Sequence, residues 1–175
     1  MRKGDWIQTY TGKKFYPLDP RPEDVCLLDI AHALSLTCRY NGHCNVFYSV
    51  AEHSFRMSVA DIPGCPKWKL LHDAAEAYVS DVPRPIKPML SEYRDLENAV
   101  MKVIAHKYDL RECDQGLIKA ADMVMLATEK RDVVNASPPW SLHLPAPLPD
   151  KINPMRPQVA EWLFLRRAVR LGIYD

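Results

Sequence analysis

Residues 70–88 read LLHDAAEAYVSDVPRPIKP, a helix-forming half followed by a proline-rich half. His72 and Asp73 are polar residues inside an otherwise apolar run. Successive side chains of a helix point roughly 100° apart around its axis. Two adjacent residues can therefore bind the same metal ion only if the ion lies at the edge of the helix, where other helices supply the remaining ligands. Glu76 follows one turn after His72 and shares its face. We therefore expect a helix over residues 66–80 that carries part of a metal site.

Two other helical stretches carry a polar residue in an apolar stripe. In SVAEHSFRMSVAD, residues 49–61, the polar residue is His53. In LIKAADMVML, residues 117–126, it is Asp122. A buried carboxylate costs on the order of several kcal/mol unless it is paired or bound to a cation. We therefore expect one divalent metal site with the ligands His53, His72, Asp73 and Asp122.

The neighbouring charges favour phosphate-ester hydrolysis. A bound metal lowers the pKa of its water toward neutral and polarises a phosphoryl oxygen. Glu76 is expected to act on that water without binding the metal, and Asp81 to orient the water, hold a sugar hydroxyl or cap the next turn. Lys87, Lys119 and Arg39 are the candidate phosphate contacts, although each alone is more often a solvated surface charge.

The composition indicates one domain over residues 1–175. The 23 Lys and Arg against 22 Asp and Glu give a net charge of +1, which excludes the broad positive surface that a nucleic-acid polymer or an anionic membrane would need. No apolar run is long enough to span a bilayer. Five cysteines without a CxxC pair suit reduced thiols in the cytoplasm. Cys38, His43 and Cys44 could be considered as zinc ligands, but a fourth ligand is missing and their spacing is not that of a zinc finger.

The rest of the chain predicts an all-α fold with irregular ends. Residues 6–16, WIQTYTGKKFY, predict a β-hairpin about a Thr-Gly turn. Asp24 is expected to cap the first helix, which should end near Asn41-Gly42. The proline-rich stretch 137–154 predicts an ordered arm laid on a surface. The other expected helices cover about residues 49–61, 89–108, 114–135 and 157–171.

The last expected helix is apolar nearly all round. Its apolar residues are Val159, Trp162, Leu163, Leu165 and Val169. One interpretation buries this helix in a homo-oligomer contact, as a dimer or hexamer, and the other makes it the last helix of the core.

The order His53, then His72-Asp73, then Asp122 resembles the H…HD…D pattern of the HD superfamily of metal-dependent phosphohydrolases, over about residues 28–130. Within that superfamily, HDAAEAYVSDVPRPIKP is similar to the HD-x-x-E…D-x-P-x-P-x-K segment of bacterial 5'-deoxynucleotidases and small phage dATP triphosphohydrolases.

The resemblance implies an HD helical bundle in which Glu76 is the acid/base residue. Lys87 and Lys119 would contact phosphate, and Arg39-Tyr40 would hold the nucleotide. Those relatives have tryptophan where this chain has Tyr40.

Deoxynucleotide hydrolysis is therefore the function we expect. The cofactor would be one divalent ion, Co, Mn, Zn, Fe or Mg. The favoured reaction is that of a dATP or dNTP triphosphohydrolase, which releases deoxynucleoside and triphosphate. One alternative is a 5'-deoxynucleotidase acting on dNMPs. The other is a catalytically silent HD module that senses nucleotides and uses the last helix as its interface.

Overall fold

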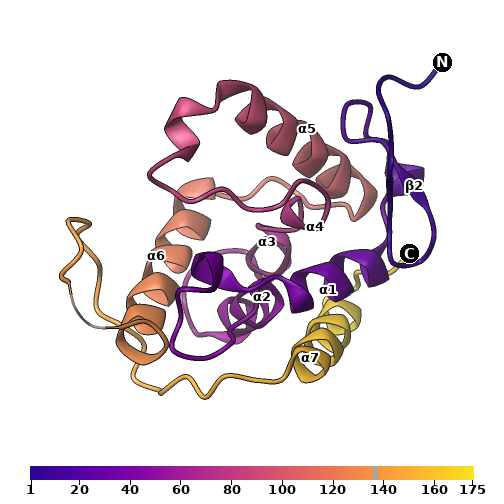
Figure 1. The fold of residues 1–175 in the computed structure, drawn as a ribbon. Helices are drawn as coiled ribbons and strands as arrows, with labels where there is room; N and C mark the ends of the chain where they lie inside the picture. Colours follow the sequence, from indigo (N-terminus) through magenta and orange to yellow (C-terminus); the bar gives the residue numbers. More distant parts are fainter. Residues whose placement is uncertain (136–137) are drawn as a thin grey trace.

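The computed structural model describes residues 1–135 and 138–175 and is mostly helical, with a two-stranded antiparallel sheet near the N-terminus (Figure 1). This confirms the predicted all-α fold with an N-terminal β-hairpin. The strands are β1 (Ile7–Gln8) and β2 (Lys14–Phe15). The α-helices are α1 (Leu27–Leu36), α2 (Val50–Val59), α3 (Pro66–Leu71), α4 (Glu76–Val79), α5 (Ser91–Lys107), α6 (Gln115–Asp132) and α7 (Pro157–Arg170). The 3₁₀ turns are η1 (Pro22–Asp24), η2 (Arg39–Gly42) and η3 (Lys87–Met89).

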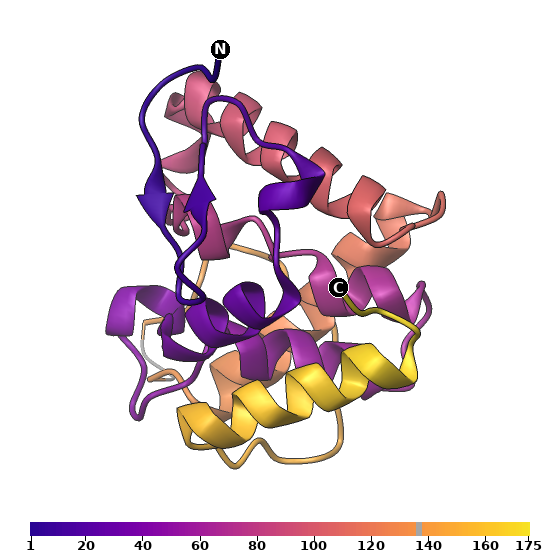
Figure 2. The same ribbon diagram turned by 90° about the vertical axis from the view of Figure 1, so that its right-hand side faces the viewer.

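The β-hairpin is fixed to the helical body through its turn and one buried ring. Gly12 turns the chain at φ +83°, a conformation that favours glycine. The amide and the hydroxyl of Thr11 both donate to the carboxylate of Asp29 in α1, at 2.7 and 2.9 Å. Phe15 is fully buried, and its ring stacks on that of Tyr78 with centroids 3.9 Å apart. The hairpin lies at the end of the molecule opposite α6 (Figure 1), above α1 in Figure 2.

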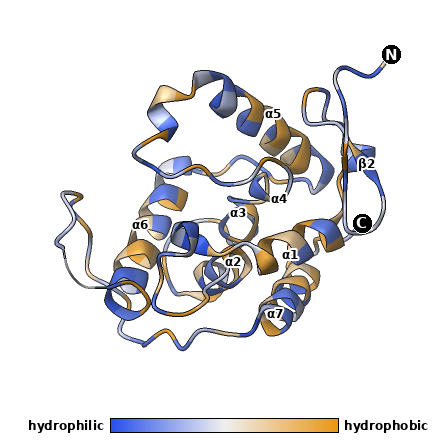
Figure 3. Ribbon diagram, in the orientation of Figure 1, coloured by the Kyte–Doolittle hydropathy of each residue, from blue (hydrophilic) through white to orange (hydrophobic). Residues whose placement is uncertain are grey.

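Two apolar clusters form the core. Fully buried members of the larger cluster include Leu34, Leu70, Ile104 and Phe164. Buried members of the smaller cluster, between α2 and α6, include Met57, Ile118, Met125 and Ile152. Figure 3 shows that α5 is apolar only toward its C-terminal end, near the hairpin, because its first half is polar. The polar first half of α5 therefore adds little to the core.

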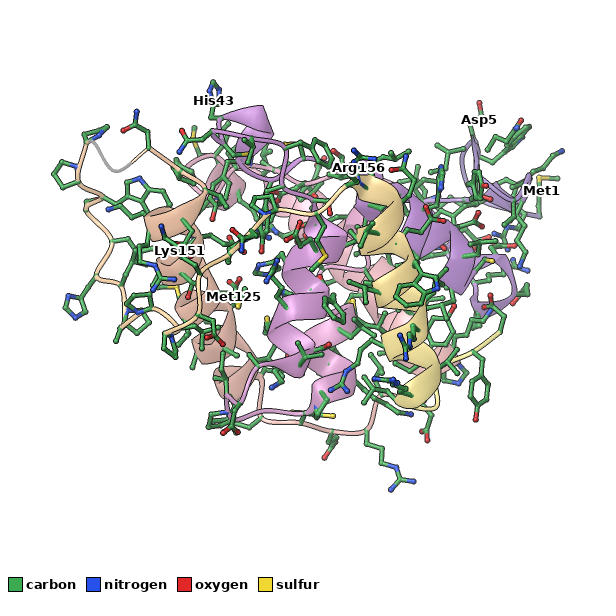
Figure 4. All side chains as sticks on the ribbon, turned by 90° about the horizontal axis from the view of Figure 1, so that it is seen from below. Met1, Asp5, His43, Met125, Lys151 and Arg156 are labelled. Atoms are coloured by element: carbon green, nitrogen blue, oxygen red, sulfur yellow. The ribbon has the colours of Figure 1, made fainter. Side chains whose placement is uncertain are left out.

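In the proline-rich arm predicted over residues 137–154, the segment from Leu148 to Ile152 lies on α6 as expected, whereas the mostly exposed segment before it extends to the side of α6 (Figure 1); Ser137 is outside the described residues. The guanidinium of Arg131 in α6 donates to the carbonyl of Leu148 at 2.6 Å. Seen from below, the chain from Lys151 to Arg156 then crosses from α6 to the start of α7 (Figure 4). The arm therefore links α6 to α7 as an ordered surface segment.

The loop after α1 begins earlier than predicted. The predicted end near Asn41-Gly42 is wrong because Cys38 has already left the helix and pairs with Ser49 in a β-bridge. The chain then turns through η2, in which Tyr40 adopts the left-handed conformation with φ 57°. Arg39 and Tyr40 are therefore carried by a tight turn.

The single helix predicted over residues 66–80 is broken into α3 and α4. Between them, the amide of Ala74 donates to the carbonyl of Leu71 and that of Glu76 to Asp73, both at 3.0 Å and three residues back. The local AAEA sequence favours a continuous helix, so its propensity does not explain the break. The tightened turn begins at the His72-Asp73 pair and thus belongs to the site.

α7 is a core helix on one side only. It packs on α1 and α2, and its buried residues are Ala160, Phe164 and Ala168. On another side, Val159, Trp162 and Val169 are 45, 55 and 60% exposed. A homo-oligomer contact through this side stays a prediction. Among the described helices, none combines the length and the apolar character needed to cross a membrane.

Asp175, and not Asp24 as predicted, caps the start of α1. Asp24 binds Arg2 instead. The amide of Leu27 donates to both carboxylate oxygens of Asp175, at 3.2 and 3.0 Å. The same carboxylate accepts from Lys107, whose Nζ lies 3.0 Å away. Local sequence did not predict this cap because Leu27 and Asp175 lie 148 residues apart along the chain.

Asp175→Ala is expected to lower the free energy of unfolding by about 1–2 kcal/mol, because a helix loses its capping acceptor. Burial opposes ionisation of Asp175, but the hydrogen bonds from Lys107 and its neighbours outweigh it and lower its pKa. The stabilisation is therefore full above the unfolded pKa of about 3.9 and is lost as the pH falls through the lower folded value. Urea unfolding at pH 7 and pH 3 measures both effects. The exposed Asp95→Ala on α5 is the control, and equal stability of Asp175→Ala and the parent protein at pH 7 would contradict the assignment.

Candidate metal centre

Two imidazoles and one carboxylate meet where α2, the turn after α3 and α6 come together. His53 Nε2 lies 3.3 Å from His72 Nε2 and 3.3 Å from Asp122 Oδ1. One ligand atom from each of these three residues lies within 4.8 Å of the other two. His53 is fully buried, and the other two are partly exposed. The cluster can hold a metal ion.

Asp73, the fourth predicted ligand, lies beside this cluster. Its Oδ2 is 3.2 Å from His72 Nε2 and 3.9 Å from His53 Nε2. The same oxygen is 3.5 Å from a guanidinium nitrogen of Arg39. All four predicted ligands are thus neighbours, and Arg39 holds Asp73 from the side.

Each imidazole is oriented by its other nitrogen. His72 Nδ1 lies 3.0 Å from the carbonyl oxygen of Lys69, which can only accept, so Nδ1 donates. His53 Nδ1 lies 2.5 Å from a carboxylate oxygen of Glu129. Both rings therefore present Nε2 to the cluster, as metal-bound histidines do. Nitrogen and carboxylate donors in this arrangement fit one divalent transition ion.

The charges around the cluster shift the pKa values of its members. Burial lowers the pKa of His53, but the carboxylates of Glu129 and Asp122 outweigh it and raise that pKa to about 9. Burial raises the pKa of Asp122, but the hydrogen bond with His53 outweighs it and holds that pKa at about 2. For Asp73, the neighbouring His72 outweighs burial and lowers the pKa well below its usual value. The carboxylates thus remain ionised, and a metal ion that binds Nε2 of His53 would displace the proton that these carboxylates favour on that ring.

Glu129 is a site residue that sequence reasoning missed. It is fully buried and accepts from His53, from the Tyr40 hydroxyl and from Arg39 Nε at 3.2 Å. Burial raises its pKa, but Arg39 and His53 outweigh this and lower it. Glu129 follows Asp122 by two helical turns in α6, and this spacing was the available signal. Glu129 is a positioning residue, since it touches the cluster only through His53.

Glu129→Gln is expected to weaken metal affinity by about 10- to 100-fold. The reason is that Glu129 orients His53 through Nδ1, the ring nitrogen that does not face the metal. The substitution should also destabilise the fold, since Arg39 loses its buried countercharge. Mn²⁺ titration by calorimetry measures the first effect and thermal unfolding the second.

The matched control is Glu52→Gln on α2. Glu52 is equally buried and binds Arg56, at 2.8 Å, without touching a histidine of the cluster. It should lose stability with unchanged Mn²⁺ affinity. Equal Mn²⁺ affinities for Glu129→Gln and the parent chain would remove the positioning role.

Glu76 lies at the edge of this cluster. The residue is 9% exposed, and its Oε2 is buried without a hydrogen-bond partner among the described residues. Burial, reinforced by the carboxylates of Asp73 and Asp81, raises the pKa of Glu76 well above its ordinary value. A carboxyl group that is buried without a partner and holds its proton tightly is suited to proton transfer.

A cavity of about 700 Å³ opens beside the cluster. Seven site residues that the sequence predicted line this cavity: Arg39, Tyr40, Asp73, Glu76, Asp81, Lys87 and Asp122. Lys87 Nζ donates to Glu97 of α5 at 2.7 Å. Lys119 is exposed on α6 and is not among the described residues that line the cavity. Of the two predicted phosphate lysines, the fold therefore brings only Lys87 to the cavity.

Arg84 is a further cation of the cavity lining, beside Arg39 and Lys87, and sequence reasoning missed it. Arg84 is exposed, and its guanidinium nitrogens lie 3.6 and 3.8 Å from the sulfur of Met123. Sulfur is a weak acceptor, so this charge is available to an anion. Trp140 lines the cavity as well, from the proline-rich arm.

Comparison with known proteins finds related bacterial chains. The chain is 36% identical over 165 residues to the uncharacterized protein YfdR of Escherichia coli, which covers 93% of each chain. It is 30% identical over 149 residues to the uncharacterized protein RCAP_rcc00048 of Rhodobacter capsulatus, covering 77% of this chain and 76% of that one. No family model matches the chain. Both similarities extend over most of each protein.

Proposed function

The chain belongs to one family with YfdR of Escherichia coli, and we propose that it is a metal-dependent phosphohydrolase of the HD superfamily that acts on deoxynucleotides. His53, His72, Asp73 and Asp122 would hold one divalent ion, Co, Mn, Zn, Fe or Mg. When bound, such an ion lowers the pKa of water toward neutral and polarises a phosphoryl oxygen.

The observation that carries the proposal is the buried Oε2 of Glu76, which has no hydrogen-bond partner among the described residues. A buried polar atom without a partner costs about 1–3 kcal/mol and needs a reason. A water or substrate atom in the cavity supplies that reason, because Glu76 lines the cavity next to Asp73. Glu76, which holds a proton because its pKa is raised, would give that proton to the leaving oxygen and take up the proton released by the attacking water.

The other cavity residues would bind the substrate. Lys87 and Arg84 would pair with phosphate oxygens and neutralise the charge that develops on them. Asp81 would hold a sugar hydroxyl or orient the water. Arg39 would keep Asp73 in place, since it already binds that carboxylate and Glu129.

We favour dATP or another dNTP as the substrate, with release of deoxynucleoside and triphosphate. A second candidate is a 5'-deoxynucleotidase acting on dNMPs. It is favoured by two positions: Lys119 lies outside the cavity lining, and Arg39 is already bound to Asp73 and Glu129, so Lys87 and Arg84 are the cations that we assign to phosphate.

The test is a product assay with Mn²⁺ or Co²⁺. Each dNTP, dNMP and matching ribonucleotide is incubated with the protein and resolved by ion-exchange chromatography. Deoxyadenosine plus intact triphosphate from dATP alone supports the triphosphohydrolase. Phosphate from several dNMPs supports the 5'-deoxynucleotidase. If no substrate is turned over, the result supports the catalytically silent module that senses nucleotides.

The proposal extends to the setting of the protein. All five cysteines are free, which suits the reducing cytoplasm. A homo-oligomer, dimer or hexamer, would use the exposed apolar side of α7.

A further inference from the structure

Trp140 has no part in the metal centre, yet its indole lines the same cavity. It comes from the proline-rich arm, whereas the facing residue Tyr40 comes from η2. The two ring centroids lie 6.2 Å apart and the planes are inclined at 45°. The rings are therefore inclined to each other without stacking, and both line the cavity.

Both rings of this wall are held from outside the cavity. The hydroxyl of Tyr40 donates to buried Glu129, which fixes the direction of the phenol ring. Lys130 Nζ lies 4.8 Å from the centroid of the Trp140 ring. Lys130 is not among the described residues that line the cavity, so the indole keeps a face for a ligand there. Aromatic rings that are fixed beforehand bind a planar ligand at a lower entropic cost.

The cavity lining combines two chemical kinds of side chain. Glu76, Asp81, Arg84 and Lys87 are among its charged members. Tyr40, Trp140, Leu126 and Leu142 supply aromatic and apolar surface, and Asn41 and Ser141 add uncharged polar groups. A ligand that uses both kinds has an anionic group and a flat, apolar-faced ring with polar edges.

We propose that Tyr40 and Trp140 form a stacking site for the base of a nucleotide. The inference rests on the proposed phosphohydrolase function, and it names the part of the cavity that selects a nucleotide over other phosphate esters. Asn41 and Ser141 would meet the polar edges of the base.

The test is nucleotide binding to the metal-free protein, followed by intrinsic tryptophan fluorescence and confirmed by calorimetry. Base stacking on an aromatic side chain is worth about 1–3 kcal/mol, which corresponds to about 5- to 150-fold in affinity. Trp140→Ala is expected to weaken dAMP binding by that factor, and Trp140→Phe by less. Trp162→Phe on α7 is the control, because its ring lies outside the cavity lining.

Steady-state kinetics supply the second arm. Trp140→Ala should raise KM for a nucleotide by a larger factor than it raises KM for 2-deoxyribose 5-phosphate, which has no base. If no ester is hydrolysed but Trp140→Ala still loses dAMP affinity, the phosphohydrolase proposal fails and the stacking site stands. If the parent enzyme hydrolyses nucleotides and Trp140→Ala binds dAMP as tightly as the parent, the stacking site is wrong.

Discussion

His72→Ala is expected to abolish metal binding and hydrolysis together. Its Nε2 lies 3.3 Å from His53 Nε2 and 3.2 Å from Asp73 Oδ2, so it joins the buried imidazole to the second carboxylate. Without His72, the described charged neighbours of Asp73 Oδ2 are Arg39, at 3.5 Å, and His53 Nε2, at 3.9 Å. A site that loses one of few protein ligands holds a divalent ion too weakly to remain loaded. Asp122→Ala should behave in the same way.

Calorimetric titration with Mn²⁺ and Co²⁺ measures the metal, and the product assay measures hydrolysis. His106→Ala is the matched control, because His106 is exposed on α5 and outside the cluster. Circular dichroism shows whether each variant is folded. A folded His72→Ala protein that still binds one equivalent of Mn²⁺ with parental affinity would show that His72 is not a ligand.

The clustering of His53, His72 and Asp122 could be predicted because these residues break helical patterns. His53 and Asp122 fall in apolar stripes, and a polar residue there needs a buried partner. The same periodicity located α2, α5, α6 and α7 close to their expected bounds. The residue types of the two strands and of the turn were sufficient to predict the hairpin, in which Gly12 adopts the positive φ.

The features that sequence reasoning missed depend on contacts between distant residues. The pairing of Cys38 with Ser49 ends α1 early, and the carboxylate of Asp175 caps its start. The break between α3 and α4 overrides a strong local helix propensity. No local pattern reports such contacts.

The supporting residues of the site illustrate the same limit. Glu129 reads as one more charged residue near a helix end until His53, Tyr40 and Arg39 converge on it. Trp140 reads as part of a proline-rich arm until the arm returns to the cavity. The proposed ligands can be found in the sequence as polar residues that interrupt an apolar helical stripe. The residues that orient them interrupt such a pattern less clearly.

Glu76→Gln is expected to lower hydrolysis by about 10²- to 10⁴-fold while metal affinity stays close to that of the parent. Glutamine keeps the size of the side chain and removes its ability to accept a proton. Burial and the carboxylates of Asp73 and Asp81 raise the pKa of Glu76, so its proton is held near the cluster and available for transfer. Its Oε2 has no hydrogen-bond partner among the described residues, so the substitution breaks no hydrogen bond to them at that atom.

Single-turnover hydrolysis and Mn²⁺ titration of the same Glu76→Gln preparation separate the two possible roles of this residue. Loss of hydrolysis with retained Mn²⁺ means that Glu76 moves a proton without binding the ion. Loss of Mn²⁺ as well would make it a fifth ligand, and full activity would remove it from the mechanism. The exposed Glu92→Gln at the start of α5 should match the parent in both measurements. Because the four proposed ligands are untouched in Glu76→Gln, this variant tests the chemistry of the cavity separately from the assembly of the metal centre.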